Sequence, residues 1–266
     1  GSDKRTTVIT YATTTAVNNL SLPYKKVVLN NSSSTSTESR YYYDGQALGT
    51  ITLGNNTKAE DWITSTTWAS STVTFNSNGL PSQKTDRRGN RTYFSYDANN
   101  LYVSSSTDAL SRTSFFTYDY ATGRVKQSTD PNGRIIKTVF DPFGRTKQIE
   151  QSDLVTPATT VVKSTIQYTD NSTPPSSIRR TDYFTSTTTN DVYSYLDGLS
   201  RSIQDRRTAD LSASTTVTDR TYDTTGALAS VSLPYFNSGT ARTTATTTSA
   251  LFTTYVYDPL QRVTAL

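Results

Sequence analysis

The sequence predicts an all-β protein built from antiparallel β-hairpins that repeat along the chain. Aspartates recur at intervals of eleven residues between positions 86 and 141. Short β-branched and aromatic segments lie between these aspartates, and no long segment shows the apolar period of an amphipathic helix. We therefore expect hairpins stacked side by side into a long, twisted, coiling sheet with almost no helix.

Each eleven-residue interval combines one turn with one strand. The aspartates that mark the intervals are Asp86, Asp97, Asp108, Asp119, Asp130 and Asp141. An aspartate side chain accepts hydrogen bonds from nearby backbone amides, Pro suits the next position, and Gly or Asn tolerates the left-handed backbone near the end of the turn. Such a turn uses about four residues and leaves about seven, which span ~23 Å as a strand.

Every second strand is predicted to carry one aromatic or β-branched face. Successive side chains of a strand point to opposite faces of the sheet, so residues two apart share a face. The predicted face residues are Thr92, Phe94, Tyr96, Ser114, Phe116, Tyr118, Ile136, Thr138 and Phe140. The strands between them, at residues 103–107 and 125–129, are more polar.

The pattern Tyr-Asp-x-x-Gly-Arg, with a period near 22 residues, resembles the YD repeat of Rhs proteins. The same repeat occurs in the B and C components of Tc insecticidal toxins and in teneurins. The resemblance covers residues 40–150 well and residues 190–266 loosely. The predicted repeat-turn residues are Tyr43, Asp44, Asp86, Gly89, Tyr96, Asp97, Asp108, Arg112, Tyr118, Asp119, Gly123, Arg124, Asp130, Gly133, Arg134, Phe140, Asp141, Gly144, Arg145, Asp197, Arg201, Tyr222, Asp223, Gly226, Tyr257, Asp258 and Arg262.

The spacing of these frames divides the chain into three sections. Residues 1–40 are expected to hold strands at 6–11, 14–17 and 25–29, followed by a Ser/Thr-rich loop at 31–39. Residues 41–150 form the regular hairpins. Residues 151–266 are expected to continue the sheet through longer, less regular hairpins, with residues 240–254 forming a strand or an exposed loop.

The composition excludes several kinds of catalytic site within this sequence. With no His and no Cys, it has no Ser-His-Asp or Cys-His arrangement, no thiolate nucleophile and no zinc site made of those residues. Ten of the nineteen aspartates lie in turn frames, where capping the turn explains their spacing. We therefore predict no catalytic residue, no metal and no cofactor. No apolar stretch approaches the length of a membrane span.

The net charge of +4 could suit a nucleic-acid surface, but six of the 26 basic residues follow the turns. These are Arg112, Arg124, Arg134, Arg145, Arg201 and Arg262. We expect them to pair with turn aspartates or to lie across tyrosine rings. That arrangement is favoured over binding of nucleic acid.

The YD resemblance implies a secreted or cell-surface protein and a structural role. In the family, the coiled sheet forms a hollow shell around a toxic polypeptide, so this chain would be a section of non-catalytic wall. Its partners would be the rest of the shell and the enclosed toxin, and an excised section could also associate through its sheet edges. Two alternatives stay open: a surface module that binds glycan or protein, and an all-β enzyme acting on carbohydrate through paired carboxylates.

Overall fold

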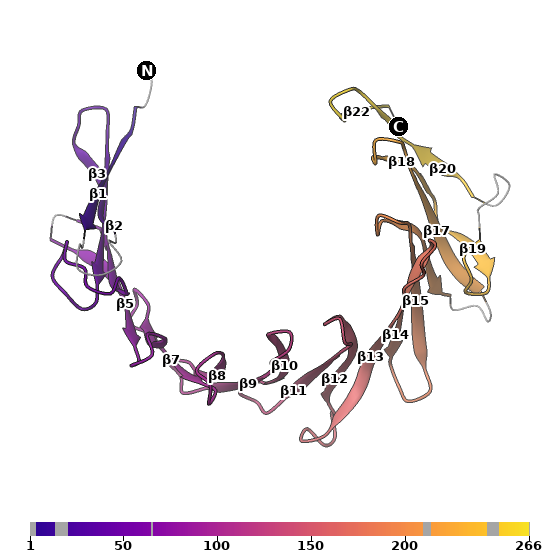
Figure 1. Ribbon diagram of the computed structural model, residues 1–266, viewed down its shortest axis with the longest axis horizontal. Coiled ribbons are helices and arrows are strands. Elements are labelled where there is room, and N and C mark those ends of the chain that lie inside the picture. The colour runs from indigo at the N-terminus through magenta and orange to yellow at the C-terminus, as the bar shows by residue number, and fades with distance from the viewer. Residues whose placement is uncertain (1–3, 14–20, 65, 210–213, 244–249, 266) are drawn as a thin grey trace. The chain divides into compact units, whose positions relative to one another are not determined.

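The computed structural model describes residues 4–13, 21–64, 66–209, 214–243 and 250–265. Its strands follow one another in chain order as antiparallel hairpins (Figure 1). Throughout these ranges the backbone forms strands, turns and bends but no helix, so no helix in them could cross a membrane. The prediction of an all-β fold made of antiparallel hairpins is confirmed.

The chain divides into two compact units, and the first contains residues 1–118 and 128–133. Its strands are β1 (Thr6–Thr13), β2 (Ser21–Leu29), β3 (Thr35–Tyr43), β4 (Asn56–Trp62), β5 (Trp68–Phe75), β6 (Pro81–Thr85), β7 (Arg91–Tyr96), β8 (Val103–Thr107) and β9 (Thr113–Asp119). Each of them pairs antiparallel with the next strand along the chain, from β1 to β9.

The second unit contains residues 119–127 and 134–266. The remaining strands are β10 (Arg124–Thr129), β11 (Ile135–Phe140), β12 (Thr146–Ser152), β13 (Thr160–Thr169), β14 (Ser176–Tyr183), β15 (Thr189–Leu196), β16 (Ser202–Thr208), β17 (Ser214–Tyr222), β18 (Leu228–Ser232), β19 (Tyr235–Ser238), β20 (Phe252–Thr254), β21 (Val256–Tyr257) and β22 (Val263–Ala265). Strands β11 to β17 pair in order, and β17 then pairs with both β18 and β19. β18 pairs with β20, and β21 pairs with β22.

The predicted alternation of faces is present in the regular hairpins. In β7, Thr92, Phe94 and Tyr96 are half-buried, whereas the residues between them are exposed. β9 alternates in the same way from Ser114 to Tyr118. In β11, Thr138 and Phe140 are half-buried, whereas Ile136, two residues earlier in the same strand, is 45% exposed.

The sheet has little buried interior in its middle part. Of the described residues between 52 and 151, none is buried. Near the N-terminus, Ala12, Tyr43 and Ile51 form a small apolar cluster. Since most side chains between 52 and 151 keep contact with water, backbone pairing and turn chemistry must supply most of the order there.

Several local predictions need correction. Residues 31–39 do not form a loop, because a short turn ends by Ser34 and β3 begins at Thr35. The Asn30 side chain closes that turn by accepting the backbone N–H groups of Ser32 and Ser34, at 3.1 and 3.0 Å. The β-branched threonines that follow are then free to pair with β2. The strand expected at residues 14–17 lies outside the described residues.

The strands of residues 151–190 are longer than those of the regular hairpins, as predicted: β13 and β14 have ten and eight residues, whereas β6 to β12 have five to seven. Their pairing is more regular than predicted, because the registers of β13 with β14 and of β14 with β15 run without a shift. In the segment 240–254, residues 240–243 are exposed and residues 252–254 form β20, while residues 244–249 lie outside the described part.

Candidate functional site

The turn that begins at Asp141 shows how a repeat frame folds. The backbone N–H of Asp141 donates to the carbonyl of Arg145, and the N–H of Gly144 donates to the carbonyl of Asp141, both at 2.9 Å. The Asp141 carboxylate also accepts the N–H groups of Phe143 and Arg145, at 2.9 and 2.8 Å. Gly144 takes the left-handed conformation, with φ of 77°. One aspartate therefore closes the turn with its backbone and its side chain together.

The same pair of backbone bonds closes five other predicted frames. These begin at Asp86, Asp108, Asp197, Asp223 and Asp258. In each of them the fourth residue is left-handed: Gly89, Ser111, Ser200, Gly226 and Gln261. Three of these five residues are not glycine, and their backbone costs roughly 1 kcal/mol. The position in the turn, and not the presence of glycine, thus determines the conformation.

The three remaining frames of the regular series are variants of this turn. The loop that begins at Asp97 is one residue longer, and the backbone N–H of Asp97 donates to the carbonyl of Tyr102. The N–H of Gly123 donates to the carbonyl of Asp119 at 2.8 Å. In the frame from Asp130 to Arg134, the left-handed Gly133 donates to the carbonyl of Asp130 at 2.9 Å.

Arginines in the turns pair with the aspartate that begins their own turn. The Nε group donates to the carboxylate at 2.7–2.8 Å in the pairs Arg112–Asp108, Arg145–Asp141, Arg201–Asp197 and Arg262–Asp258. The pKa of Asp108 is lowered by the Arg112 side chain, and the pKa of Asp197 by the backbone N–H of Arg201. Arg124 does not pair in this way, since it donates instead to the Gly144 carbonyl at 2.6 Å.

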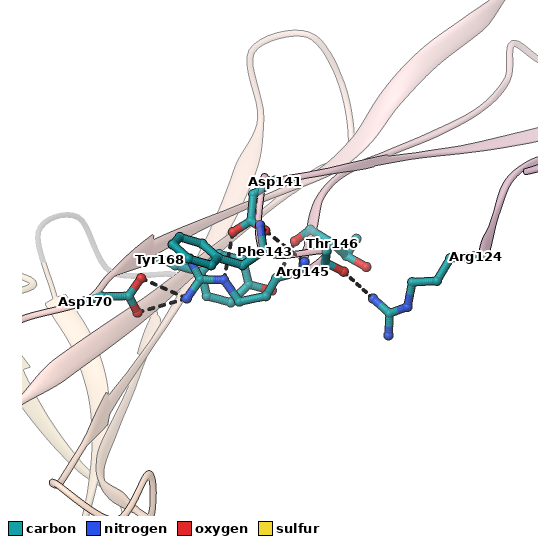
Figure 2. A network of polar contacts seen from close by, with 8 residues as sticks. Arg124, Asp141, Phe143, Arg145, Thr146, Tyr168 and Asp170 are labelled. Atoms are coloured by element: carbon teal, nitrogen blue, oxygen red, sulfur yellow. Dashed lines mark hydrogen bonds and ion pairs between the residues drawn. The ribbon is translucent and has the colours of Figure 1, made fainter. Parts of the chain in front are cut away.

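The turn arginines also reach the ring of the next hairpin. The guanidinium of Arg145 lies 4.1 Å from the centre of the Tyr168 ring, and that of Arg201 lies 4.2 Å from the Tyr222 ring. Arg145 also binds Asp170 at 2.8 Å, so Figure 2 shows it stretched between two aspartates and covered by the tyrosine. Neighbouring hairpins are thereby joined at their turns.

This joint has two further forms. Arg124 lies 5.4 Å from the centre of the Phe140 ring. After the Asp97 turn, Tyr102 occupies the place of the arginine and stacks on Tyr118, with the ring centres 4.5 Å apart. Either a guanidinium group or an aromatic ring can therefore pack against the ring of the next hairpin.

The tyrosine hydroxyls complete the connection. Five of them donate to a backbone carbonyl at or near the start of a preceding strand: Tyr43 to Pro23, Tyr96 to Pro81, Tyr168 to Thr146, Tyr222 to Ser202 and Tyr257 to Leu228, at 2.7–3.1 Å. Burial raises the pKa of Tyr43 and Tyr96. The raised pKa keeps the hydroxyls of Tyr43 and Tyr96 protonated, as their donated bonds require.

Asp44 differs from the other frame aspartates. Its carboxylate accepts four backbone N–H groups, from the consecutive residues 52 to 55, at 2.8–3.0 Å. Burial alone would raise the pKa of Asp44, but the four amides outweigh it and hold the pKa at about 2. The side chain organises the whole loop between β3 and β4.

Some other functional residues were not found from the sequence. Asp153 begins the turn after β12, and Asn30 and Asn76 begin turns with an amide oxygen in place of a carboxylate. Asp170 follows β13 and accepts from Arg145. Asn76 could have been found, because it follows Phe75 and precedes Gly79 by three residues. Asp170 could have been found from Tyr168, which stands two residues before it, as Tyr195 stands two residues before Asp197.

An open hollow of about 670 Å³ lies beside the joint in Figure 2 and is lined by Arg124, Phe143, Arg145 and Tyr168, among others. Its polar groups already have partners, since Arg145 binds two aspartates and Arg124 binds a carbonyl. In the described part of the chain no three acidic side chains are grouped so that they could hold a metal. The polar groups that line this hollow therefore join neighbouring hairpins.

A buried polar cluster, which the sequence did not predict, lies between β16, β17 and β19. Arg206 and Gln204 are fully buried, and the Arg206 Nε donates to the Gln204 side-chain oxygen at 2.8 Å. Asp219 accepts from Gln204 at 2.5 Å and from the Tyr235 hydroxyl at 2.6 Å. Burial, together with the Asp219 carboxylate, raises the pKa of Tyr235 to about 12. Arg206 also holds the Gly239 carbonyl at 3.0 Å, which fixes the segment after β19.

No protein-family model and no curated protein matches the sequence. Among solved structures, the chain is similar to the complex TcdB2-TccC3, with a TM-score of 0.72 and 14% identity. That match covers 97% of this chain and 19% of the other. The Photorhabdus luminescens Tc holotoxin pore matches with a TM-score of 0.56 and 15% identity, over 97% of this chain and 15% of the other. The likeness is one of fold, and the chain spans less than a fifth of the length of these proteins.

Proposed function

We propose that this chain is a section of the non-catalytic wall of a hollow β shell, of the kind found in Rhs and Tc toxin proteins. The observation that supports this most strongly is the match of 97% of the chain to TcdB2-TccC3. The frames that resemble YD repeats begin the turns of the same fold. They are, in this proposal, degenerate YD repeats.

The hydrogen bonds and ion pairs of the turns support the proposal of a non-catalytic wall. Each frame aspartate is occupied by the amides of its own turn, and the arginines are occupied by aspartates, carbonyls and rings. Catalysis needs groups that converge on a substrate and are matched in pKa to their task. Here the polar groups point to each other and keep neighbouring hairpins together, which is what a wall requires.

The proposed wall has three sections, residues 1–40, 41–150 and 151–266. Its partners are the remainder of the parent shell and a polypeptide that the shell encloses. The parent would be a secreted toxin protein, and this section would take no cofactor. Its role is to separate the enclosed polypeptide from water and from proteases.

Limited proteolysis of the parent protein tests this function. An enclosed polypeptide should resist protease while the wall is intact. Asp44→Asn, which disturbs the four-amide loop, should expose it to cleavage at lower protease concentration. Asp182→Asn provides a matched control, because the Asp182 carboxylate accepts from Arg180 on the same strand and closes no turn.

Two results would contradict the proposal. One is a parent protein in which no segment is protected, whatever the state of the turns. The other is saturable binding of a glycan or a protein to the isolated chain, abolished by removing surface aromatic residues, which would favour the adhesion module.

A further inference from the structure

Residues 239–243 follow β19, form no strand and lie across one face of the sheet. We call these five residues, GTART, the strap. The hydroxyl of Tyr195 on β15 donates to the carbonyl of Thr240. The side chain of Gln204 on β16 donates to the carbonyl of Thr243. Side chains of the sheet, and not backbone pairing, therefore hold the strap in place.

The pairing register brings the side chains beneath the strap to the same face. Tyr195 lies directly opposite Gln204, and Gln204 lies directly opposite Asp219. Arg206, two residues from Gln204, lies opposite Val217. Residues that are directly opposite, or two apart in one strand, share a face of the sheet. The strap thus covers a set of side chains that three successive strands place together.

Gln204 binds the backbone of the strap in both directions. Its Nε2 group donates to the carbonyl of Thr243, and its Oε1 accepts the N–H of Thr243 at 3.2 Å. Any residue except proline can form this pair of bonds, because only proline lacks the N–H group. Gln204 therefore recognises a peptide backbone and not a particular side chain.

Arg206 adds a requirement for a hydroxyl group. It is fully buried, and its guanidinium donates to the Thr243 Oγ1 and to the Gly239 carbonyl, the latter at 3.0 Å. The Asn237 side chain donates to the same hydroxyl at 3.1 Å. A buried cation is stable only when oxygen atoms accept its N–H groups. The strap supplies two such oxygens, one from its backbone and one from a threonine.

The residues beneath the strap are also held by contacts that do not involve it. Asp219 accepts from Gln204 at 2.5 Å and from the Tyr235 hydroxyl at 2.6 Å. The Arg206 Nε donates to Gln204 at 2.8 Å. These bonds orient the amide and the guanidinium without the strap, and water could reach the freed donors once it leaves. A site that is oriented in advance loses little conformational entropy when it binds a ligand.

We propose that Tyr195, Gln204 and Arg206 form a binding site for a short peptide that carries a serine or threonine, and that the strap occupies this site from within the chain. The strap is then a removable ligand, and a separate peptide of the same chemistry can replace it. This inference uses only contacts within the second unit and does not rest on the proposed shell function.

Hydrogen exchange tests the closed state. The Thr243 amide lies outside every strand but donates to Gln204, so it should be protected from exchange. Thr243→Val removes the hydroxyl that Arg206 and Asn237 bind and should lower the protection factor of this amide about tenfold. Arg242→Ala is the matched control, because it shortens an exposed side chain of the strap and should leave the protection factor unchanged.

Binding of a separate peptide tests the site itself. Thr243→Pro removes both the N–H and the hydroxyl and should release the strap. That variant should bind a labelled, acetylated and amidated GTART peptide, as measured by fluorescence anisotropy. The natural chain should bind the peptide at least tenfold more weakly, because its tethered strap competes at a high effective concentration. The peptide GTARP should bind to neither chain.

The same peptide is also titrated into Thr243→Val, so that the test does not depend on one variant. Urea unfolding shows whether each variant remains folded. An unprotected Thr243 amide in the natural chain would overturn the proposal. So would equal binding of GTART by the natural chain and Thr243→Pro, or no binding by either variant when the variants unfold cooperatively.

Discussion

The hairpins of residues 81–118 and the strands β16 to β19 are stabilised in different ways. In the hairpins no residue is buried, and order comes from turn carboxylates, backbone pairing and ring contacts. Between β16 and β19, by contrast, Gln204, Arg206 and Val217 are completely buried. One repeat can therefore build a sheet without a core, whereas a buried polar cluster forms where a further segment covers the sheet.

Among the variants considered, replacement of Arg206 should lower the free energy of unfolding most. Arg206→Ala would leave a cavity and remove the donors from the Gln204 side chain and the Gly239 carbonyl. We expect a loss of about 3 kcal/mol or more in the free energy of unfolding, measured with urea. Arg207→Ala, at the exposed neighbouring position, should change it by less than about 0.5 kcal/mol. Equal effects of the two variants would show that the cluster does not stabilise this region.

The second-largest effect is expected at Asp44, which is less buried than Arg206. Its replacement tests whether a carboxylate alone can hold a loop in place. Asp44→Asn should lower the free energy of unfolding by roughly 2 to 3 kcal/mol. The two carboxylate oxygens together accept four backbone N–H groups, and in asparagine one of these oxygens is replaced by an NH2 group, which cannot accept. The folded pKa of about 2 lies below the ordinary 3.8, so this stabilisation is present above pH ~4 and is lost as the pH falls toward 2.

The pH dependence gives the control for that variant. The difference between the natural chain and Asp44→Asn, measured by urea unfolding, should be large at pH 6 and should shrink near pH 2. A difference that does not depend on pH would mean that the loop is held by packing of Tyr43 and Ile51 and not by the carboxylate.

The contact between Arg201 and Tyr222, which joins two hairpins, should contribute a smaller but measurable amount to the free energy of unfolding. Tyr222→Phe removes the hydroxyl bond to the Ser202 carbonyl but keeps the ring under Arg201, and should cost about 1 kcal/mol. In a double-mutant cycle, Arg201→Ala and Tyr222→Ala should show a coupling of about 0.5 to 1 kcal/mol. A coupling of zero would mean that the stacked geometry contributes nothing to stability.

Changes at the left-handed turn positions should have the smallest effect. Ser111→Gly and Ser200→Gly relieve a strained backbone and should each stabilise the chain by about 0.5 kcal/mol. Gly144→Ala should be more costly than Gly133→Ala, because the added carbon would meet Thr122 at 3.0 Å, whereas no atom lies within 4 Å at Gly133. Thermal unfolding of the four variants measures this order, which equal losses at both glycines would contradict.

The sequence by itself determined the turns and the alternation of faces. Asp86, Asp108 and Asp141 close their turns through residues at most four positions away, so spacing alone was sufficient to find them. The alternation in β7 follows in the same way from the period of a strand. The same local rule does not give burial: Ile136 is 45% exposed while Phe140 in the same strand is half-buried, because exposure depends on what surrounds the strand.

The tertiary structure alone decided which distant groups meet. Arg145 finds Tyr168 and Asp170 more than twenty residues away, and Arg206 meets Gly239 across 33 residues. It also decided that β17 pairs with both β18 and β19. Contacts of this kind depend on strand register and on which segment covers the sheet, and neither is encoded in a short window of sequence.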